Sequence, residues 1–266
     1  MVMGVVNVTP DSFSDGNIFF AADAAIQHAM ELVAMGADIL DVGGESTRPG
    51  AVPVAPAEER RRVMPVIEAL ASGVSVPISI DTRHEEVAMA AIHAGASIVN
   101  DIEAGRSQRG MWRVVRDAGA GYVCMHMQGE PATMQRNPSY RDVVSEVRGF
   151  LAERVAELAS FGIDPECVAI DPGIGFGKDL GHNLALLRAL PDFVGLGQPV
   201  LLGVSRKGFI GTVTHAPEMA GRLAGGLACA LHAAQCGVSV IRTHDVAETI
   251  RALKMLAVLQ PMEPLP

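Results

Sequence analysis

The residues best suited to chemistry in this chain are polar or charged side chains that each end a short apolar run. They occupy eight positions: Asn7, Asp41, Asp81, Asn100, His126, Asp171, Ser205 and Arg242. Carboxylates and amides can hold a ring that carries hydrogen-bond donors and acceptors, such as a purine or pterin, and metal ligation is their competing role. His244 follows Arg242 by two residues, so alternation along a strand predicts both side chains on one face, able to bind a diphosphate.

The apolar runs before these residues read as strands of a parallel sheet. Parallel strands that are buried on both faces are nearly continuous Val, Ile and Leu, and barrel enzymes place their chemistry where such strands end. Helical patterns separate the runs, and five of them close on glycine: Gly36, Gly95, Gly119, Gly162 and Gly237. Eight such units in 266 residues predict an α/β fold, a (β/α)8 TIM barrel, as a single domain over residues 1–266.

Two long loops at the predicted strand ends carry groups that could contact a ligand. Residues 7–16 include Phe13, and residues 43–50 place Arg48 after paired glycines. The first loop could be a mobile lid over a ring or an ordinary turn rich in Asp, Ser and Gly. Arg48 could bind a carboxylate or phosphate, or form a salt bridge within its own loop. The sequence leaves both alternatives open.

Later strand ends add three further candidate groups. Met125 could lie against a flat ring, although core filling is the commoner role of such a methionine. Residues 171–178 are rich in glycine but lack the spacing of a nucleotide-binding P-loop, so they predict a tight loop that exposes Asp171 and places Phe176. Lys207 lies beside the predicted pocket, where an unpaired ammonium group would be costly.

Composition argues against several classes of function. A formal net charge of -9 disfavours nucleic-acid binding, which needs a dense basic patch. No apolar stretch approaches the roughly 20 residues of a membrane span, and the chain opens on a predicted strand without a signal-peptide pattern, so we expect no membrane partner and a cytoplasmic location. Zinc and a serine nucleophile are also not expected, because the histidines lack the usual ligand spacings and no Gly-x-Ser-x-Gly motif occurs.

Five motifs, in the order in which they occur, resemble those of dihydropteroate synthase. They are residues 7–16 (NVTPDSFSDG), 43–50 (GGESTRPG), 171–178 (DPGIGFGK), 205–207 (SRK) and 242–244 (RTH). The resemblance covers nearly the whole chain, and the combination is far more specific than any one motif. It implies a transferase of folate biosynthesis that joins 6-hydroxymethyl-7,8-dihydropterin diphosphate to 4-aminobenzoate and releases 7,8-dihydropteroate and diphosphate.

The resemblance also implies the roles of the site residues. The pterin would be held by Asp81, Asn100, Asp171 and Lys207, with Met125 against its ring. The diphosphate would be held by Asn7, Arg242 and His244, with Mg2+ bridging Asn7 and the phosphate oxygens. The aminobenzoate would be covered by two mobile loops through Thr9, Phe13, Asp15, Thr47, Arg48 and Pro49, and would also meet Phe176, Ser205 and Lys207. Gly203 is a further expected substrate contact, and Asp15 is expected to act in catalysis with the pterin-binding residues.

Some positions depart from the family pattern. Arg83, His84 and Glu103 stand near the predicted pterin floor, where other residues are common. Gly208 and Phe209 follow Lys207 where Ser and then an apolar residue are usual. Sulfonamide drugs share the aminobenzoate pocket in this family, so the resemblance implies sulfonamides as competitive inhibitors and the last two departures suggest altered susceptibility.

The oligomeric state and two rival functions stay open at this point. Apolar faces on the predicted helices 222–235 and 246–259 fit packing on the barrel, while the resemblance suggests a homodimer through this end. A methyltetrahydrofolate-dependent methyltransferase shares the Asp and Asn floor, and a catalytically silent pterin-binding barrel would serve regulation. The methyltransferase has no need for residues 205–207 and 242–244. A silent barrel would not require Asn7, Lys207, Arg242 and His244, so both rivals are less favoured.

Overall fold

The computed structural model describes residues 1–9, 18–46, 50–106 and 109–259. Its strands are β1 (Val2–Asn7), β2 (Ile39–Gly43), β3 (Ile78–Asp81), β4 (Ile98–Asp101), β5 (Gly121–Met125), β6 (Val168–Asp171), β7 (Leu201–Gly203) and β8 (Val240–Thr243). Its α-helices are α1 (Ile18–Ala34), α2 (Pro56–Gly73), α3 (Glu85–His93), α4 (Gly110–Ala118), α5 (Val143–Phe161), α6 (Leu180–Arg188), α7 (Leu190–Val194), α8 (Gly208–Thr214), α9 (Leu223–Gln235) and α10 (Val246–Leu259).

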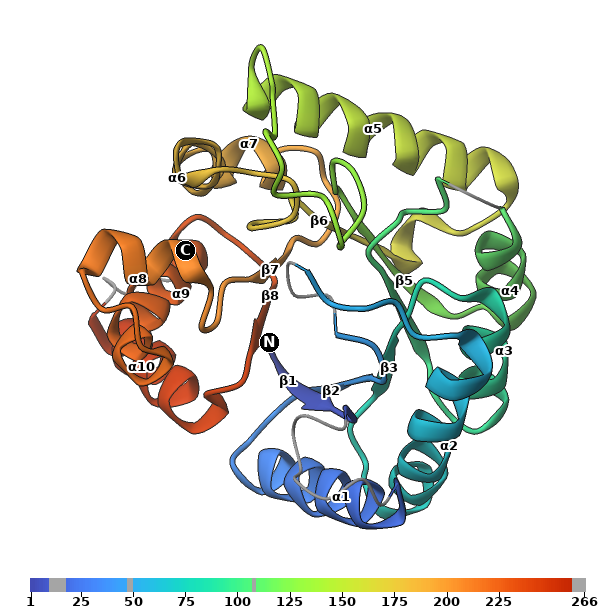
Figure 1. Cartoon of the computed structure of the whole chain (residues 1–266). Coiled ribbons are helices and arrows are strands. Elements are labelled where there is room, and N and C mark those ends of the chain that lie inside the picture. Colours follow the sequence, from blue (N-terminus) through green and yellow to red (C-terminus); the bar gives the residue numbers. More distant parts are fainter. Residues whose placement is uncertain (10–17, 47–49, 107–108, 260–266) are drawn as a thin grey trace, which may run out of the picture.

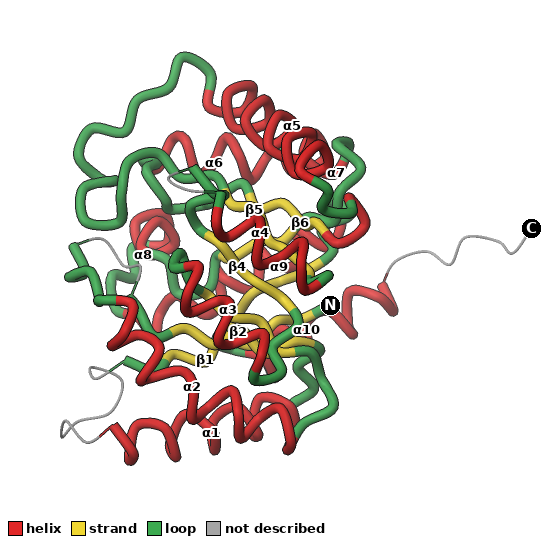
Figure 2. Tube along the Cα trace, turned by 90° about the vertical axis from the view of Figure 1, so that its right-hand side faces the viewer, coloured by secondary structure: helices red, strands yellow, loops and turns green. Residues whose placement is uncertain are grey.

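The strands form a nearly closed parallel barrel. In the described residues eight strands join in the order β6-β5-β4-β3-β2-β1-β8-β7. The ends of this order meet at a single parallel bridge between Ile170 and Val200, and the Ile170 amide donates to the Pro199 carbonyl at 2.9 Å. Figure 1 looks along the barrel and shows the helices around the strands, while Figure 2 shows the same arrangement from the side. The predicted (β/α)8 TIM barrel is confirmed.

The inside of the barrel is layered, with apolar residues below polar ones. One buried cluster consists of strand residues alone: Met3, Ile39, Val123, Leu201 and Val240. Side chains alternate between the two faces of a strand, so the residue two positions further along faces the same way. Asp41 therefore follows Ile39 on the inner face, and Arg242 follows Val240. The apolar layer supports the polar strand ends from below.

The predicted glycine junctions between helices and strands are confirmed. Gly36, Gly95, Gly119, Gly162 and Gly237 all have positive φ, between 61° and 114°. Gly119 and Gly162 cap α4 and α5 directly, and each donates its amide to the last turn of its helix. The left-handed conformation costs glycine little, because it has no Cβ to clash with the backbone.

The bounds of the last two strands differ from the sequence prediction. The apolar runs predict strands over residues 200–204 and 238–241, whereas β7 covers only Leu201–Gly203 and β8 covers Val240–Thr243. Hydropathy reports burial, but the extent of a strand is set by hydrogen bonds to its neighbours. Because β8 pairs Arg242 with Met3 of β1, Arg242 lies within the strand and its position is fixed by the sheet.

No helix in the described residues combines the length and the apolar character that crossing a bilayer requires.

Candidate active site

A cavity of about 820 Å³ opens where the strands end. Its walls come from the carboxyl ends of β1, β7 and β8, the loop after β6 and the first turns of α6 and α8. Predicted site residues that line it are Asn7, Thr9, Phe176, Gly203, Ser205, Lys207, Arg242 and His244. The barrel therefore brings together residues from both ends of the chain.

The remaining predicted site residues fall into two groups. Asp81, Asn100, Met125 and Asp171 end neighbouring strands, and they lie beside the cavity without belonging to its lining. Phe13, Asp15, Thr47, Arg48 and Pro49 lie outside the described residues. The roles expected of this second group stay predictions.

An ion-paired arginine forms the floor of the site. Arg242 Nε donates to Asp41 Oδ2 at 2.6 Å, and Arg242 Nη2 donates to Asp81 Oδ2 at 2.6 Å. Asn100 Nδ2 donates to the same Asp41 oxygen at 3.1 Å. Asp41 is wholly buried, and its position between Arg242 and Asn100 makes it the central acceptor of the floor. These contacts tie the ends of β2, β3, β4 and β8 together.

Burial and neighbouring charges shift the pKa values of the groups on this floor. Burial raises the pKa of Asp81 to about 7, and the Asp41 and Glu45 carboxylates add to the rise, while Arg242 lowers it. Burial alone would lower the pKa of the Arg242 guanidinium, but Asp41 and Asp81 more than reverse this and hold it above its ordinary value. One permanent cation is thus shared by two carboxyl groups, of which Asp81 can gain or lose a proton near neutral pH.

Lys207 crosses from the loop after β7 toward the end of β6. Its ammonium group lies 4.7 Å from the centre of the Phe176 ring and donates to the Ile174 carbonyl. Burial lowers the pKa of Lys207 to about 8, opposed by the Asp171 carboxylate. Burial raises the pKa of Asp171, opposed chiefly by Lys207, and Asp171 Oδ1 accepts from the Gly173 amide at 2.7 Å. The predicted neighbours Asp171, Phe176 and Lys207 therefore form one polar and aromatic group.

Met125 is buried in an apolar cluster beside that group. It is grouped with Ile102, Met127 and Met134, against which Phe176 is partly buried. The polarizable thioether fits both alternatives that the sequence leaves open, core filling and contact with a flat ring. The role against a bound ring stays a prediction.

Ser205 joins the ends of β7 and β8. Its hydroxyl accepts from the His244 amide at 3.2 Å and lies 3.1 Å from His244 Nδ1. The same hydroxyl donates to Asp245 Oδ2 at 3.4 Å, and Asp245 also pairs with Arg206 at 2.6 Å. His244 is therefore held at the rim of the cavity by a network that includes both loops.

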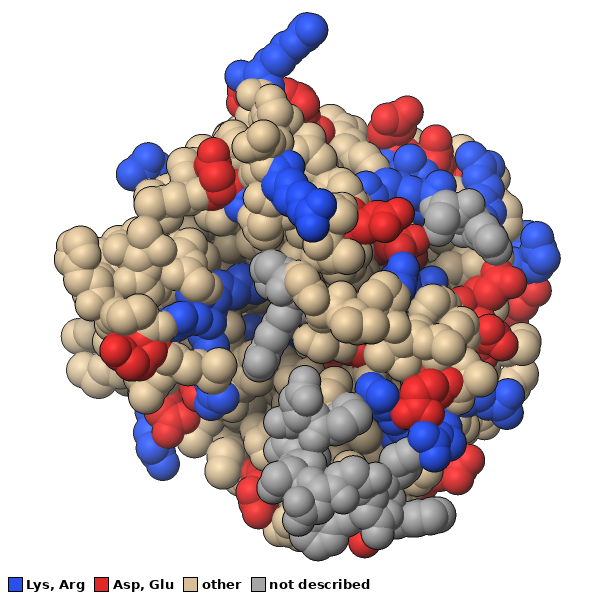
Figure 3. All heavy atoms as spheres, viewed as in Figure 1, with Lys and Arg blue, Asp and Glu red and all other residues tan. Residues whose placement is uncertain are grey.

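The cavity is locally cationic in an acidic protein. Its charged lining in the described residues is Lys178, Arg206, Lys207, Arg222 and Arg242, against the single carboxylate of Asp179. Figure 3 shows Lys and Arg atoms within and beside the hollow at the centre of this face. The whole chain has a formal charge of -9, so its overall field would not attract an anionic substrate. The attraction would come from these local cations.

A buried lysine and histidine support the loop after β6. Lys178 Nζ donates to the carbonyls of Phe176 at 3.0 Å and His126 at 3.2 Å, and lies 3.0 Å from His126 Nδ1. Burial lowers the pKa of Lys178 to about 7, and Asp171 opposes this shift. Burial and the nearby Lys178 lower the pKa of His126 to about 3, so the ring is neutral and accepts from the lysine.

Asn7 offers a suitable ligand for the magnesium ion that the resemblance implies. It ends β1 and lines the cavity together with Arg242 and His244. Mg2+ prefers oxygen ligands and usually keeps several waters, with one or two protein groups and substrate phosphates completing its shell. A single amide oxygen beside a predicted diphosphate site is consistent with this preference of Mg2+.

Comparison with known proteins decides the family. The profile described as "Pterin binding enzyme" matches residues 3–244. The chain belongs to the pterin-binding enzyme family. Within this family it is 46% identical over 255 residues to the dihydropteroate synthase of Escherichia coli K12. The alignment covers 96% of this chain and 90% of the relative. The resemblance stated from the motifs is thereby confirmed.

Three solved structures of pterin-binding enzymes match closely. Dihydropteroate synthase of Xanthomonas albilineans with 4-aminobenzoic acid has a TM-score of 0.93 and 47% identity, and the match covers 98% of this chain and 93% of that one. The same enzyme in complex with 7,8-dihydropteroate has a TM-score of 0.89 and 45% identity, with coverage of 98% and 94%. A Yersinia pestis synthase in a sulfonamide drug complex has a TM-score of 0.91 and 41% identity, with coverage of 97% and 94%.

The structure adds two residues to the predicted site. Asp41 is one of the eight polar strand ends, so the pattern that indicates Asp81 indicates it too, but neither its type nor its spacing predicts a role. Lys178 lies in the glycine-rich stretch 171–178, which predicts only a tight loop. Its buried contact with His126 joins the loops after β6 and β5, and no sequence pattern reveals such a pairing.

The lowered pKa of Lys178 predicts a dependence of stability on pH. Its folded pKa of about 7 lies below that of an unfolded lysine, so the unfolded chain binds more protons between these values and stability is lost as pH falls toward 7. Relative to a Lys178→Met variant, the wild-type free energy of unfolding should rise by about 2 kcal/mol from pH 7 to pH 9. Urea unfolding at both pH values measures this difference.

The exposed Lys254 provides the control for this measurement. A Lys254→Met variant should show the wild-type pH dependence. If the difference in unfolding free energy between wild type and Lys178→Met does not change from pH 7 to pH 9, the lowered pKa of Lys178 is contradicted.

Proposed function

We propose that this chain is a dihydropteroate synthase with a single barrel domain, acting in folate biosynthesis. Its substrates are 6-hydroxymethyl-7,8-dihydropterin diphosphate and 4-aminobenzoate, and its products are 7,8-dihydropteroate and diphosphate. The observation that supports this most strongly is a cavity with a cationic lining that lies beside the carboxyl and amide groups at the ends of β3, β4 and β6. A protein that only bound a pterin would not need this cationic lining.

The floor suits the pterin ring because it offers both donors and acceptors. Asn100, Asp81 and Asp171 come from the ends of β4, β3 and β6, and Lys207 reaches the same region from the loop after β7. A pterin carries amino, ring nitrogen and carbonyl groups on one edge, which such a set can satisfy. Asp171 and Asp81 have raised pKa values when no ligand is present, so a cationic or donating ring would favour their charged forms.

The cationic lining of the cavity suits the diphosphate. Arg242, His244 and Ser205 line the cavity together with Asn7, which ends β1. Arg242 is already fixed by two carboxylates, so it would meet the phosphate oxygens without the cost of ordering a free side chain. When bound at Asn7, Mg2+ would supply further neutralisation of phosphate charge.

The reaction we infer is a dissociative substitution at the pterin methylene carbon. The bond from this carbon to the diphosphate oxygen breaks, and its electron pair leaves with the diphosphate. The resulting cation is shared by the ring, whose charge the Asp171 carboxylate can stabilise. The amine nitrogen of 4-aminobenzoate then forms the new bond and releases a proton. An aromatic amine placed in line needs no strong general base, so binding and orientation supply most of the catalysis.

The aminobenzoate would enter beside Phe176, Lys207 and Ser205. Phe176 presents a ring for stacking, and the Lys207 ammonium over that ring can attract a carboxylate. The predicted closing residues Thr47, Arg48 and Pro49 lie outside the described residues, and their contact with this substrate is part of the proposal. Closure of these residues over the site would keep water from reacting with the pterin methylene cation.

Product formation tests the proposed activity directly. The purified chain is incubated with the dihydropterin diphosphate, 4-aminobenzoate and Mg2+, and dihydropteroate is followed by chromatography with and without EDTA. Turnover that stops on chelation is the expected result. Pterin binding without turnover would favour a silent pterin-binding barrel, and methyl transfer from methyltetrahydrofolate would favour the methyltransferase.

A matched pair of histidine variants tests the proposed diphosphate site. His244→Ala should lower kcat/KM by about a hundredfold, because a donor to the leaving group is lost. His93→Ala, at an exposed position on the outer helix α3, should leave kcat/KM unchanged. Equal activity of both variants would contradict the role of His244.

Sulfonamides are proposed as competitive inhibitors whose affinity depends on Gly208. Gly208 and Phe209 begin α8 and line the cavity, and a Cβ added at Gly208 would meet no atom within 4 Å. A Gly208→Ser substitution should therefore fit and stiffen the helix start, lowering the sulfonamide inhibition constant about two- to fivefold. Steady-state inhibition measures this change, with Gly149→Ser on the exposed face of α5 as the control. Equal inhibition of wild type and Gly208→Ser would refute the proposal.

A homodimer through the last helices is also proposed, together with a cytoplasmic location. Figure 1 shows α9 and α10 side by side, and the outer face of α10 exposes Met255, Val258 and Leu259 at 56%, 80% and 68%. Val258→Asp should convert the dimer into a monomer, because burying a carboxylate in an apolar interface is costly. Chromatography with light scattering measures this, and Val52→Asp, on a residue that is 82% exposed in the loop before α2, should remain dimeric. A monomeric wild type would contradict the dimer.

A further inference from the structure

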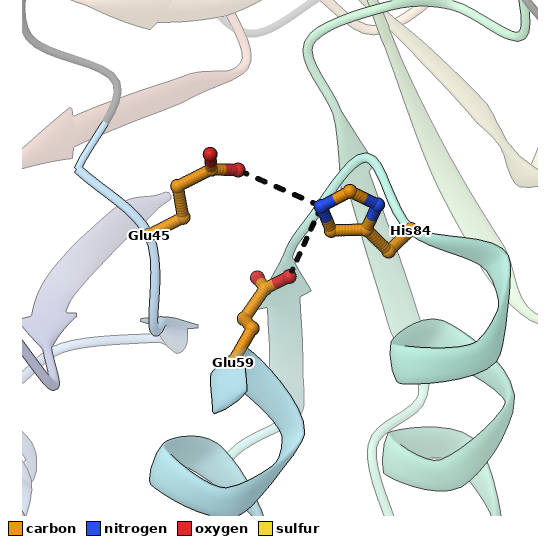
Figure 4. A group of neighbouring side chains, drawn as sticks. All are labelled: Glu45, Glu59 and His84. Carbon is orange, nitrogen blue, oxygen red and sulfur yellow. Dashed lines mark ion pairs between the residues drawn. The ribbon is translucent and has the colours of Figure 1, made fainter. Parts of the chain in front are cut away.

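Three side chains outside the active-site cavity converge on one point. Glu45 follows β2, Glu59 lies in the first turn of α2, and His84 precedes the first residue of α3. One ligand atom from each lies within 4.8 Å of the others. Figure 4 shows both carboxyl groups directed at the same nitrogen of the His84 ring.

The spacing of these atoms is close to that of ligands around one small cation. His84 Nε2 lies 3.9 Å from Glu45 Oε2 and 3.9 Å from Glu59 Oε2. Two ligands about 2.1 Å from a zinc ion lie roughly 3.4 Å apart at the tetrahedral angle. The two distances from His84 Nε2 to the carboxylate oxygens would therefore each need to shorten by about 0.5 Å for the groups to share an ion. A separation of 3.9 Å is too long for a hydrogen bond.

Two buried polar atoms in this cluster lack a hydrogen bond in the described part of the chain. They are Glu59 Oε1 and His84 Nε2. The Glu59 side chain is 0% exposed, so water does not compensate its free oxygen at the protein surface. An unsatisfied buried acceptor costs about 1–3 kcal/mol, and such a cost in a polar cluster calls for a ligand or a functional reason.

The surrounding groups hold the three side chains in place. Thr82 Oγ1 donates to Glu59 Oε2 at 3.0 Å, and the same hydroxyl accepts from the His84 amide at 3.1 Å. The Val54 amide donates to Glu45 Oε1 at 3.1 Å. Partners of this kind orient metal ligands in known sites.

The local charge also favours a divalent cation. Arg83 pairs with Glu45 at 3.0 Å and with Glu103 at 3.3 Å, so one guanidinium faces the three carboxyl groups of Glu45, Glu59 and Glu103. Asp81 adds to the negative field at Glu59.

An ion could reach this cluster from solvent. Arg83 and His84 line a surface cavity of about 840 Å³ whose lining shares no residue with the active-site cavity. The site is thus separate from the magnesium site proposed at Asn7.

We propose that Glu45, Glu59 and His84 bind one divalent transition-metal ion of the zinc class, with water as the fourth ligand. One imidazole and two carboxylates suit zinc better than magnesium, which prefers oxygen ligands alone. The ion would cross-link the start of the loop after β2 to α2 and α3. The ion would bind the folded chain but not the unfolded chain, and it would therefore stabilise the folded state.

Equilibrium dialysis of the metal-stripped full chain against zinc chloride tests the proposal. One zinc ion per chain is expected, with affinity lowered at least tenfold by His84→Asn and by Glu59→Gln. Asn is a favourable residue at the start of a helix, and Gln reproduces the neutral form of Glu59, so both variants should fold. Thermal unfolding confirms this, and zinc should raise Tm by several degrees in wild type but not in either variant.

His93→Asn and Glu68→Gln are the matched controls, because both residues are exposed on the same helices, α3 and α2. Both should bind zinc as wild type does, and a hundredfold excess of Mg2+ should not displace the ion. Absence of zinc binding would overturn the proposal and leave a histidine paired with two carboxyl groups. Binding retained in His84→Asn, or lost only in Cys236→Ser near His232, would place the ion elsewhere and equally overturn it. None of these outcomes depends on synthase activity.

Discussion

The shared guanidinium of Arg242 is the contact on which the interior of this barrel depends. It pairs with Asp41 and Asp81, which are 201 and 161 residues away in the sequence, and so joins β8 to β2 and β3. Removing one partner of a buried ion pair typically costs about 3–5 kcal/mol, because the remaining charge is left unpaired. The apolar layer of Ile39 and Val240 beneath it excludes water and keeps that interaction strong.

The same arrangement prepares the cavity for its proposed substrate. Each charged group of the floor is held in a position set by a strand, so little reorganisation is needed when a ligand binds. Burial raises the pKa of Asp81 to about 7 and lowers that of Lys207 to about 8, which leaves both groups able to respond to a ligand near neutral pH. An acidic protein thus offers a local cationic site to a diphosphate.

The end of β3 connects this floor with the proposed zinc cluster. Asp81 is directed into the barrel toward Arg242, whereas Thr82 is directed toward Glu59 of α2. Successive residues of an extended chain face opposite ways, so one strand end serves an inner network and an outer one. Glu45 stands at the corresponding point after β2, just before the residues that the resemblance assigns to the aminobenzoate loop.

The order of the elements, the barrel and most of the strand-end residues could be predicted from the sequence. A repeated local pattern carries that information: an apolar run, a polar end, and a helix closed by a glycine such as Gly119 or Gly162. The family could also be predicted, since short motifs such as residues 171–178 keep their residue types at fixed spacing.

Which polar groups meet depends on how the chain folds in space. Arg242 pairs with Asp41, and Lys178 pairs with His126, although each pair is far apart in the chain. Glu45, Glu59 and His84 converge in the same way. No sequence pattern predicts a zinc ligand set here, because the three residues come from separate βα units and show no ligand spacing. Closing the barrel brings such units side by side, and the contacts across neighbouring units depend on that closure and on burial, which no local pattern encodes.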